Sequence, residues 1–229
     1  MSLAIVYTRA ALGIEAPLIT VEVHLSNGLP GLTMVGLPET TVKEARDRVR
    51  SALINSGYAF PAKKITINLA PADLPKEGGR YDLPIALALL VASEQLNTTR
   101  LNQYEFVGEL ALTGGLRGVP GAIPSAMEAI KAGRRIVVSS DNAAEVGLIG
   151  GSDCLVADHL QEVCAFLAGQ TSLSPPLAEA PARDERYEDL LDVIGQQQGR
   201  PTRGIDLFIM MLFDDFNIKA TFQLGDHLG

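Results

Sequence analysis

The segment 69–90 carries the residues of this chain whose types and spacing could do chemistry. It reads LAPADLPKEGGRYDLPIALALL, which is the end of a strand, a loop rich in proline, glycine and charge, and an apolar helix. The charged side chains of the loop and the helix start are Lys76, Glu77, Arg80 and Asp82. The loop has no serine, cysteine, histidine or threonine, so it could hold a charged ligand but offers no nucleophile for covalent catalysis.

Two interpretations of these charged side chains stay open. In the first, they pair locally and shape the turn. In the second, Lys76 and Arg80 contact phosphate or a partner subunit, since both are strong donors to oxyanions.

A second group of cations lies on the helix expected over residues 41–56. Lys43, Arg46 and Arg50 fall together on the flank of its apolar face. They form either a solvated helix face or a surface for an anionic ligand. TVKE, residues 41–44, reads as a capping box that would start this helix at Thr41.

The sequence contains no motif for a metal site or for a nucleotide site. The histidines, His24, His159 and His227, are scattered, and none has a carboxylate or cysteine at ligand spacing, so we expect no metal site. The phosphate loop G-x-x-x-x-G-K-[ST] is absent, and PKEGG at 75–79 resembles only part of it. Cys154 and Cys164 read as buried thiols in a reducing cytoplasm.

The elements that must position these residues indicate an α+β fold. Strands are expected over 3–7, 18–25, 32–36, 63–70 and 135–139, with a strand pair over 106–113 and a glycine-rich turn over 112–121. Helices are expected over 41–56, 83–95, 122–132 and 160–167. The first three strands should form an antiparallel meander, and the helices should pack on the sheet.

Composition and charge bound the functional classes. The chain has 229 residues, a net charge of −8 and 47% hydrophobic residues, enough for one sizeable core. Most of the acidity lies after residue 170, whereas residues 41–80 are locally basic. The acidic total argues against a strong free-standing DNA-binding protein. No secretory signal or membrane-length apolar run is visible, so we expect a cytoplasmic protein with no membrane partner.

Two long motifs carry a family resemblance: PGLTMVGLPETTVKEARDRVRSALINSGYAFPAKKITINLAPADLPKEGGRYDLPIALALL and FVGELALTGGLRGVPGAIPSA. They resemble the N-terminal domain of the ComM/YifB proteins, a magnesium-chelatase-related AAA+ group, over residues 1 to about 199. The resemblance implies a Lon-protease-like domain, similar to ribosomal-protein domain 2, with a β-α-β-α sheet and helices packed on it. Lon proteases use a serine–lysine dyad, and Arg80 and Ile123 stand at the two corresponding positions. The resemblance therefore implies a proteolytically inactive domain with no catalytic residue.

The resemblance also implies a domain plan and partners. Residues 1–168 would be the Lon-like (ChlI-type) domain, 169–186 a linker and 187–199 the junction to an AAA+ domain. Residues 200–229 would be a divergent tail in place of the motor, and so a truncated product. Full-length relatives would be hexameric DNA helicases that promote branch migration, with ATP and Mg²⁺ bound in the motor, so this chain would bind no cofactor.

On this reading the chain itself is not expected to be an enzyme. We expect it to contact DNA through Lys43, Arg46, Arg50, Lys76 and Arg80, and to self-associate or join the subunits of an AAA+ ring. The alternative is a purely structural interaction domain that binds no nucleic acid, which the acidic net charge favours. A residual hydrolase activity is a third hypothesis, which the absent dyad disfavours.

Overall fold

The computed structural model describes residues 2–36, 39–74, 76, 78–149 and 152–176, which belong to one compact unit within Met1–Ala180. The predicted junction and tail, and the predicted linker from residue 177 onward, lie outside the described residues. Residues 169–176 of that linker are described, and Ser174 pairs with Val156 of β9. In chain order the elements are β1 Ser2–Arg9, β2 Leu18–Ser26, β3 Gly31–Val35, α1 Glu39–Asn55, β4 Lys64–Ala70, the 3₁₀ turn η1 Gly79–Tyr81, α2 Asp82–Ala92, η2 Leu101–Gln103, β5 Tyr104–Phe106, β6 Glu109–Leu110, β7 Leu116–Arg117, α3 Ala122–Lys131, β8 Arg135–Ser139, η3 Ser140–Asn142, α4 Ala143–Gly147, β9 Cys154–Ala157 and α5 Leu160–Leu167.

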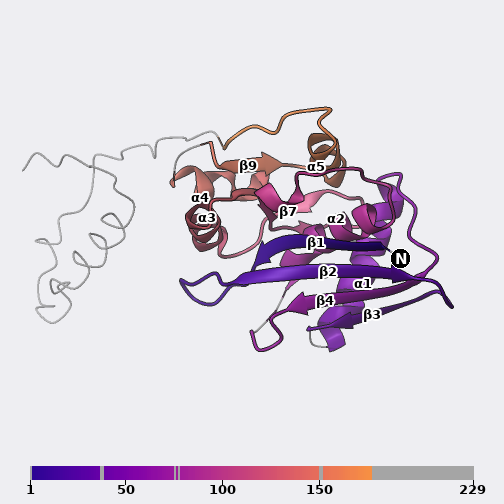
Figure 1. The fold of residues 1–229 in the computed structure, drawn as a ribbon. Coiled ribbons are helices and arrows are strands. Elements are labelled where there is room, and N and C mark those ends of the chain that lie inside the picture. Colours follow the sequence, from indigo (N-terminus) through magenta and orange to yellow (C-terminus); the bar gives the residue numbers. More distant parts are fainter. Residues whose placement is uncertain (1, 37–38, 75, 77, 150–151, 177–229) are drawn as a thin grey trace, which may run out of the picture. The chain divides into compact units, whose positions relative to one another are not determined.

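Seven of the described strands form one mixed sheet in the order β3-β4-β2-β1-β5-β8-β9 (Figure 1). The pairs β1–β2 and β2–β4 are antiparallel, and the other four pairs are parallel. This architecture confirms the α+β class that the sequence predicts. The strands β6 and β7 form a separate small hairpin.

The antiparallel meander predicted for the first three strands is wrong at β3. This strand pairs in parallel with β4, which lies between β3 and β2. Parallel neighbours need a long crossover, and the 17-residue helix α1 between β3 and β4 supplies it. The predicted third strand therefore exists, but it lies at the edge of the sheet.

The start of α1 also differs from the prediction. The helix begins at Glu39, so Thr41 lies inside it and does not act as the N-cap of a capping box.

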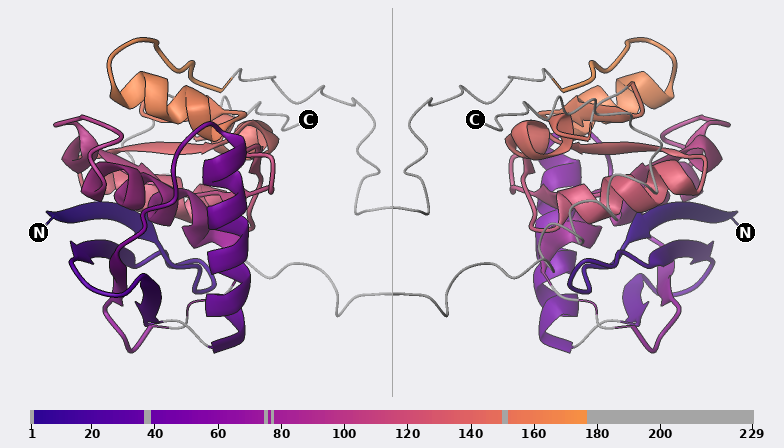
Figure 2. Two further views of the ribbon diagram at one scale, coloured as in Figure 1. Left: turned by 90° about the vertical axis from the view of Figure 1, so that its right-hand side faces the viewer. Right: turned by 90° about the vertical axis from the view of Figure 1, so that its left-hand side faces the viewer.

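The core lies mainly between one face of the sheet and the helices α1, α2 and α5. Helix α2 is buried almost all round, and it packs on β1 and β2 as well as on α1. Figure 2 shows α1 standing on one side of the indigo strands. Near β8 and β9 the other face is covered too, because Ile136 and Val138 pack with α3 while Val137 faces the main core.

On β1, the face of the sheet opposite the main core is open to solvent. Its alternate residues Leu3 and Ile5 are 62% and 41% exposed, whereas Ala4 and Val6 between them are buried. Val35 on the edge strand β3 is 49% exposed as well. The strands β1 to β4 therefore have helices on one side only.

Buried ion pairs join distant parts of this unit. Arg9 at the end of β1 donates from Nε and Nη2 to the two carboxylate oxygens of Glu105, at 2.6 and 2.8 Å. Arg134 donates to Glu105 as well, at 2.9 Å. Since β1 and β5 meet at a single register point, this network holds the two halves of the sheet together.

Candidate functional site

The loop between β4 and α2 ends in the 3₁₀ turn η1, which carries Arg80 into the interior. Arg80 is only 4% exposed. Its Nη1 donates to the carbonyl oxygen of Pro120 at 3.1 Å, and its Nη2 donates to Ser125 Oγ at 2.9 Å. Ser125 Oγ in turn donates to the carbonyl oxygen of Gly121 at 2.8 Å. The guanidinium therefore ties the loop before α2 to the start of α3.

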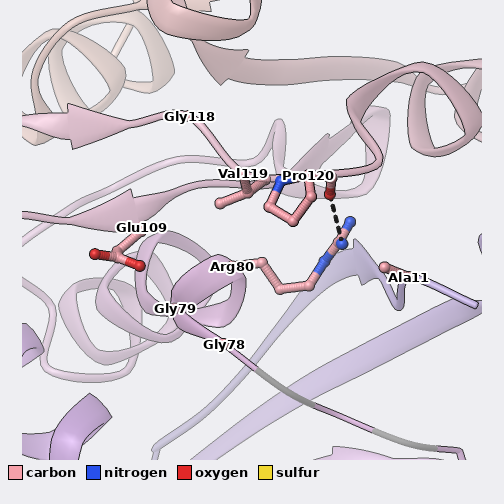
Figure 3. Close-up of a pocket in the computed structure, with 8 residues that line it drawn as sticks. All are labelled: Ala11, Gly78, Gly79, Arg80, Glu109, Gly118, Val119 and Pro120. Carbon is pink, nitrogen blue, oxygen red and sulfur yellow. Dashed lines mark hydrogen bonds between the residues drawn. The ribbon is translucent and has the colours of Figure 1, made fainter.

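A cleft of about 560 Å³ opens beside this arginine (Figure 3). Three stretches of chain meet there with Ala11, namely η1 and its preceding glycine, the start of β6, and the turn that follows β7. The lining residues are Ala11, Gly78, Gly79, Arg80, Glu109, Gly118, Val119 and Pro120. None of these lining residues is a serine, threonine, cysteine, lysine or histidine, so the cleft walls hold neither the hydroxyl or thiol nor the amine base that a serine–lysine dyad needs.

The two positions that the family resemblance assigns to the protease dyad hold neither a serine nor a lysine. Arg80 lies in the cleft wall, and burial lowers the pKa of its guanidinium. Ile123 is the second residue of α3 and is half-buried. The hydroxyl that Arg80 contacts is that of Ser125. Ser125 Oγ accepts a hydrogen bond from Arg80 and donates its own hydrogen to a backbone carbonyl oxygen, so neither partner is a base that could activate it.

Asp82, the first residue of α2, is held by a helix that is remote in sequence. Its Oδ2 accepts from Arg48 Nε at 2.7 Å and its Oδ1 from Nη2 at 3.3 Å, and Leu110 N–H adds a third bond at 3.3 Å. The side chain of Asp82 is 1% exposed. Burial raises the pKa of Asp82 to about 6 although the Arg48 ion pair lowers it. The pair joins α1 to α2 beneath the loop.

Lys76 serves the loop itself. It is 2% exposed, and its Nζ donates to the carbonyl oxygens of Pro71 and Leu74. Burial lowers the pKa of this ammonium group, with Asp73 acting in the opposite direction. Of the two interpretations of the loop cations, the geometry at Lys76 therefore matches the one in which they shape the turn. Glu77 lies outside the described residues.

The three α1 cations lie on the surface, away from the cleft. Lys43, Arg46 and Arg50 are all exposed. Arg46 Nε pairs with Asp47 at 3.0 Å, and the Arg50 guanidinium carbon lies 4.9 Å from the centre of the Phe60 ring.

A groove of about 460 Å³ runs beside this helix face. It is lined by Arg46, Arg50, Phe60 and Lys63, together with Asp47 and apolar residues of β3 and β4. The groove thus contains two of the five predicted DNA-contacting residues, Arg46 and Arg50, and adds Lys63 to them. Lys43 is exposed on the same helix, whereas Lys76 and Arg80 lie in the interior. Whether any of them binds DNA stays a prediction.

Neither metal ligands nor a membrane span are found in the described part of the chain. No group of three or more histidine, cysteine or carboxylate side chains could hold a metal ion there. His159 instead caps α5, where its Nδ1 accepts from Gln161 N–H at 3.2 Å. No helix among these residues is long and apolar enough to cross a membrane.

Sequence reasoning missed several residues that shape this site. Arg48 lies in the predicted helix, but nothing in its local pattern points to a partner 34 residues away. Glu109 also escapes notice, because its role depends on how the turn after β7 folds back on η1. The sequence places Ser125 just inside a helix, which favours a role at the helix start over catalysis, but it does not indicate Arg80 as its partner. The glycine-rich composition of 112–121 was the one available signal, and it indicates close backbone approach.

Comparison with known proteins places this arrangement in a family. Residues 21–142, more than half of the chain, match the family described as subunit ChlI of Mg-chelatase. The chain belongs to the ChlI family. The matched range contains the whole of α1, the Arg80 loop and the turn after β7, so the family and the candidate site coincide.

Relatives narrow this to the ComM/YifB group. The chain is 73% identical to the uncharacterized protein YifB of Salmonella typhimurium and 71% identical to that of Escherichia coli, over 90% of its length in each case. It is 55% identical to the competence protein ComM of Haemophilus influenzae over 87% of its length. The match spans only 40% of the length of each of these relatives.

Proposed function

We propose that this chain is the non-proteolytic, Lon-like module of a ComM/YifB-type protein, and that it contacts DNA and helps to assemble the ring of subunits. In this proposal the ATP- and Mg²⁺-dependent motor of a branch-migration helicase lies in the remaining part of its relatives. The name of the Haemophilus relative, a competence protein, fits a role with incoming DNA.

The observation that carries the non-proteolytic part is the state of Arg80. A peptidase of the serine–lysine type needs a free hydroxyl beside an amine that can take its proton. The corresponding position in this chain holds a buried guanidinium whose two terminal nitrogens donate to Pro120 and Ser125. A guanidinium keeps its proton in proteins and cannot act as a general base.

The surface that supports the DNA contact is the α1 groove with Arg46, Arg50 and Lys63, together with Lys43 on the same helix. These cations are exposed and lie on one helix face and the neighbouring β4 start. Cations of this kind bind the phosphate backbone without sequence preference, and they lose affinity as salt displaces them. Phe60 beside Arg50 adds an aromatic wall of the kind that stacks on exposed bases.

Fluorescence anisotropy with labelled single-stranded and forked DNA over a salt series tests the proposal. We expect saturable binding at low salt that the triple substitution K43E/R46E/R50E abolishes. The substitution K131Q is a control, because Lys131 is a similarly exposed cation on α3. If the wild-type chain fails to bind at about 50 mM salt, where phosphate contacts are strong, the DNA role is refuted.

An assembly role without DNA is the second candidate, and the open face of the sheet favours it. Leu3, Ile5 and Val35 are exposed on strands that have helices on one side only. Analytical ultracentrifugation of the chain with L3K or I5K separates the two candidates. If these substitutions disrupt self-association while the α1 substitutions leave it unchanged and DNA binding is absent, the assembly role stands alone.

A further inference from the structure

Arg80 is a buried cation whose charge is not balanced by a carboxylate in the described part of the chain. The hydrogen bonds to Pro120 and Ser125 use two of its five N–H donors, and both acceptors are neutral oxygens. Its Nε is buried without a partner. A buried polar group without a partner is rare in folded proteins and points to a ligand or another function.

The cleft beside Arg80 has room for a small ligand and backbone that allows close approach. Gly78, Gly79 and Gly118 line it without side chains. A Cβ atom at Gly79 would lie 2.3 Å from Glu109 Oε2, so a larger residue there would require the Glu109 side chain to move. Val119, Pro120 and Ala11 supply apolar lining around the guanidinium.

Glu109 gives the same cleft a second, opposite charge. Its side chain is 29% exposed, and its Oε1 lies 3.5 Å from Arg117 Nη1 at the surface. The cleft therefore presents a cation at Arg80 and a carboxylate at Glu109, whose side chain is directed away from the guanidinium (Figure 3).

We propose that the Arg80 cleft binds a carboxylate ligand of the acylamino-acid or peptide C-terminus class. The carboxylate accepts from the N–H groups of Arg80 Nη1 and Nη2 that Pro120 and Ser125 leave unused, and the rest of the ligand lies along the glycine-lined wall. A planar carboxylate fits the guanidinium donors. A doubly charged phosphate is disfavoured because Glu109 shares the cleft and repels it.

This site is separate from the α1 groove proposed for DNA. The residues that line the cleft and those that line the groove do not overlap. The cleft ligand and the DNA therefore bind independently, and failure of one proposal leaves the other standing.

Nuclear magnetic resonance of the isotope-labelled full chain tests the proposal with matched probes at constant ionic strength. We expect N-acetylglycine to shift the amide resonances of Gly78, Gly79 and Gly118 saturably, with a dissociation constant on the order of 1 mM. N-acetylglycinamide, which lacks only the carboxylate, should leave them in place. Inorganic phosphate should bind at least about 10-fold more weakly, a difference of about 1.4 kcal/mol.

Variants supply the second arm of the test. R80Q should weaken N-acetylglycine binding at least about 10-fold, whereas R46Q, in the α1 groove, should leave it unchanged. Should R80Q fail to fold, the comparison of the three probes on the wild-type chain still decides the matter. The proposal is overturned if N-acetylglycine produces no saturable shift, if its amide binds equally well, or if phosphate binds as tightly.

Discussion

The buried ion pair between α1 and α2 makes the stability of this domain depend on pH in an unusual direction. Burial raises the pKa of Asp82 from its ordinary value of 3.8 to about 6. The folded protein therefore holds this proton more tightly than the unfolded chain. Between about pH 4 and about pH 6 the folded state binds more protons, so the contribution of Asp82 to the free energy of unfolding falls as the pH rises.

The size of the effect follows from the shift of roughly two pKa units. Each unit corresponds to about 1.4 kcal/mol, and part of the effect lies below pH 4, so the contribution of Asp82 decreases by about 2 kcal/mol from about pH 4 to about pH 7. D82N has no proton to titrate at this position. The difference in unfolding free energy between the wild type and D82N should therefore change by about 2 kcal/mol over that range, with the wild type losing stability relative to D82N as the pH rises.

Urea unfolding followed by circular dichroism at several pH values measures this difference. R48M provides an independent check, because it leaves the Asp82 carboxyl buried without its cation. At pH 7 that loss should cost about 3–5 kcal/mol. At pH 5 the cost should be smaller, since Asp82 is then protonated. A difference between wild type and D82N that is flat with pH, or that has the opposite slope, would refute the reasoning.

Three further changes test other parts of the structure. R46Q should make the slope of log K for DNA binding against log salt concentration less steep by about 0.7–0.9. K131Q, which removes a cation of similar exposure, should leave this slope unchanged, and equal effects of the two substitutions would contradict a contact at α1. E105Q should destabilise the fold by about 3–5 kcal/mol in urea because it leaves the buried Arg9 and the partly buried Arg134 without their carboxylate, and a loss below about 1 kcal/mol would show that the network is dispensable. G36A should lower the melting temperature, since φ is +89° and the new Cβ would lie 2.4 Å from the carbonyl oxygen of residue 69; the expected cost is about 1–3 kcal/mol, and an unchanged melting temperature would argue against this backbone geometry.

Much of the fold could be predicted from periodicity. Alternation in LITVEVHL predicts β2, the apolar arc of residues 42–53 predicts α1, and the apolar run after Asp82 predicts α2. The local pattern does not indicate which strand is the neighbour of which. The sequence of β3 would suit a strand beside β2 or beside β4, and only the packing of α1 across the sheet places it beside β4.

The candidate site was harder to predict, because charged residues in a glycine-rich loop look solvent-exposed in sequence. Lys76 and Arg80 are buried because carbonyl oxygens of remote or folded-back segments accept from them, and those segments meet only in three dimensions. The α1 cations follow the local rule, since helical spacing alone fixes their common face. Sequence thus predicts surface charge on a helix well and buried charge in a turn poorly.

The outer edge of β9 has a consequence for anyone who divides this chain. Val156 N–H donates to the carbonyl oxygen of Ser174 at 3.0 Å, and Leu173 packs against the core, so the segment after α5 shields that strand. A fragment that stopped at residue 168 would strip away this cover and leave a bare strand for other molecules to pair with, inviting aggregation. Expression boundaries are better drawn beyond residue 176.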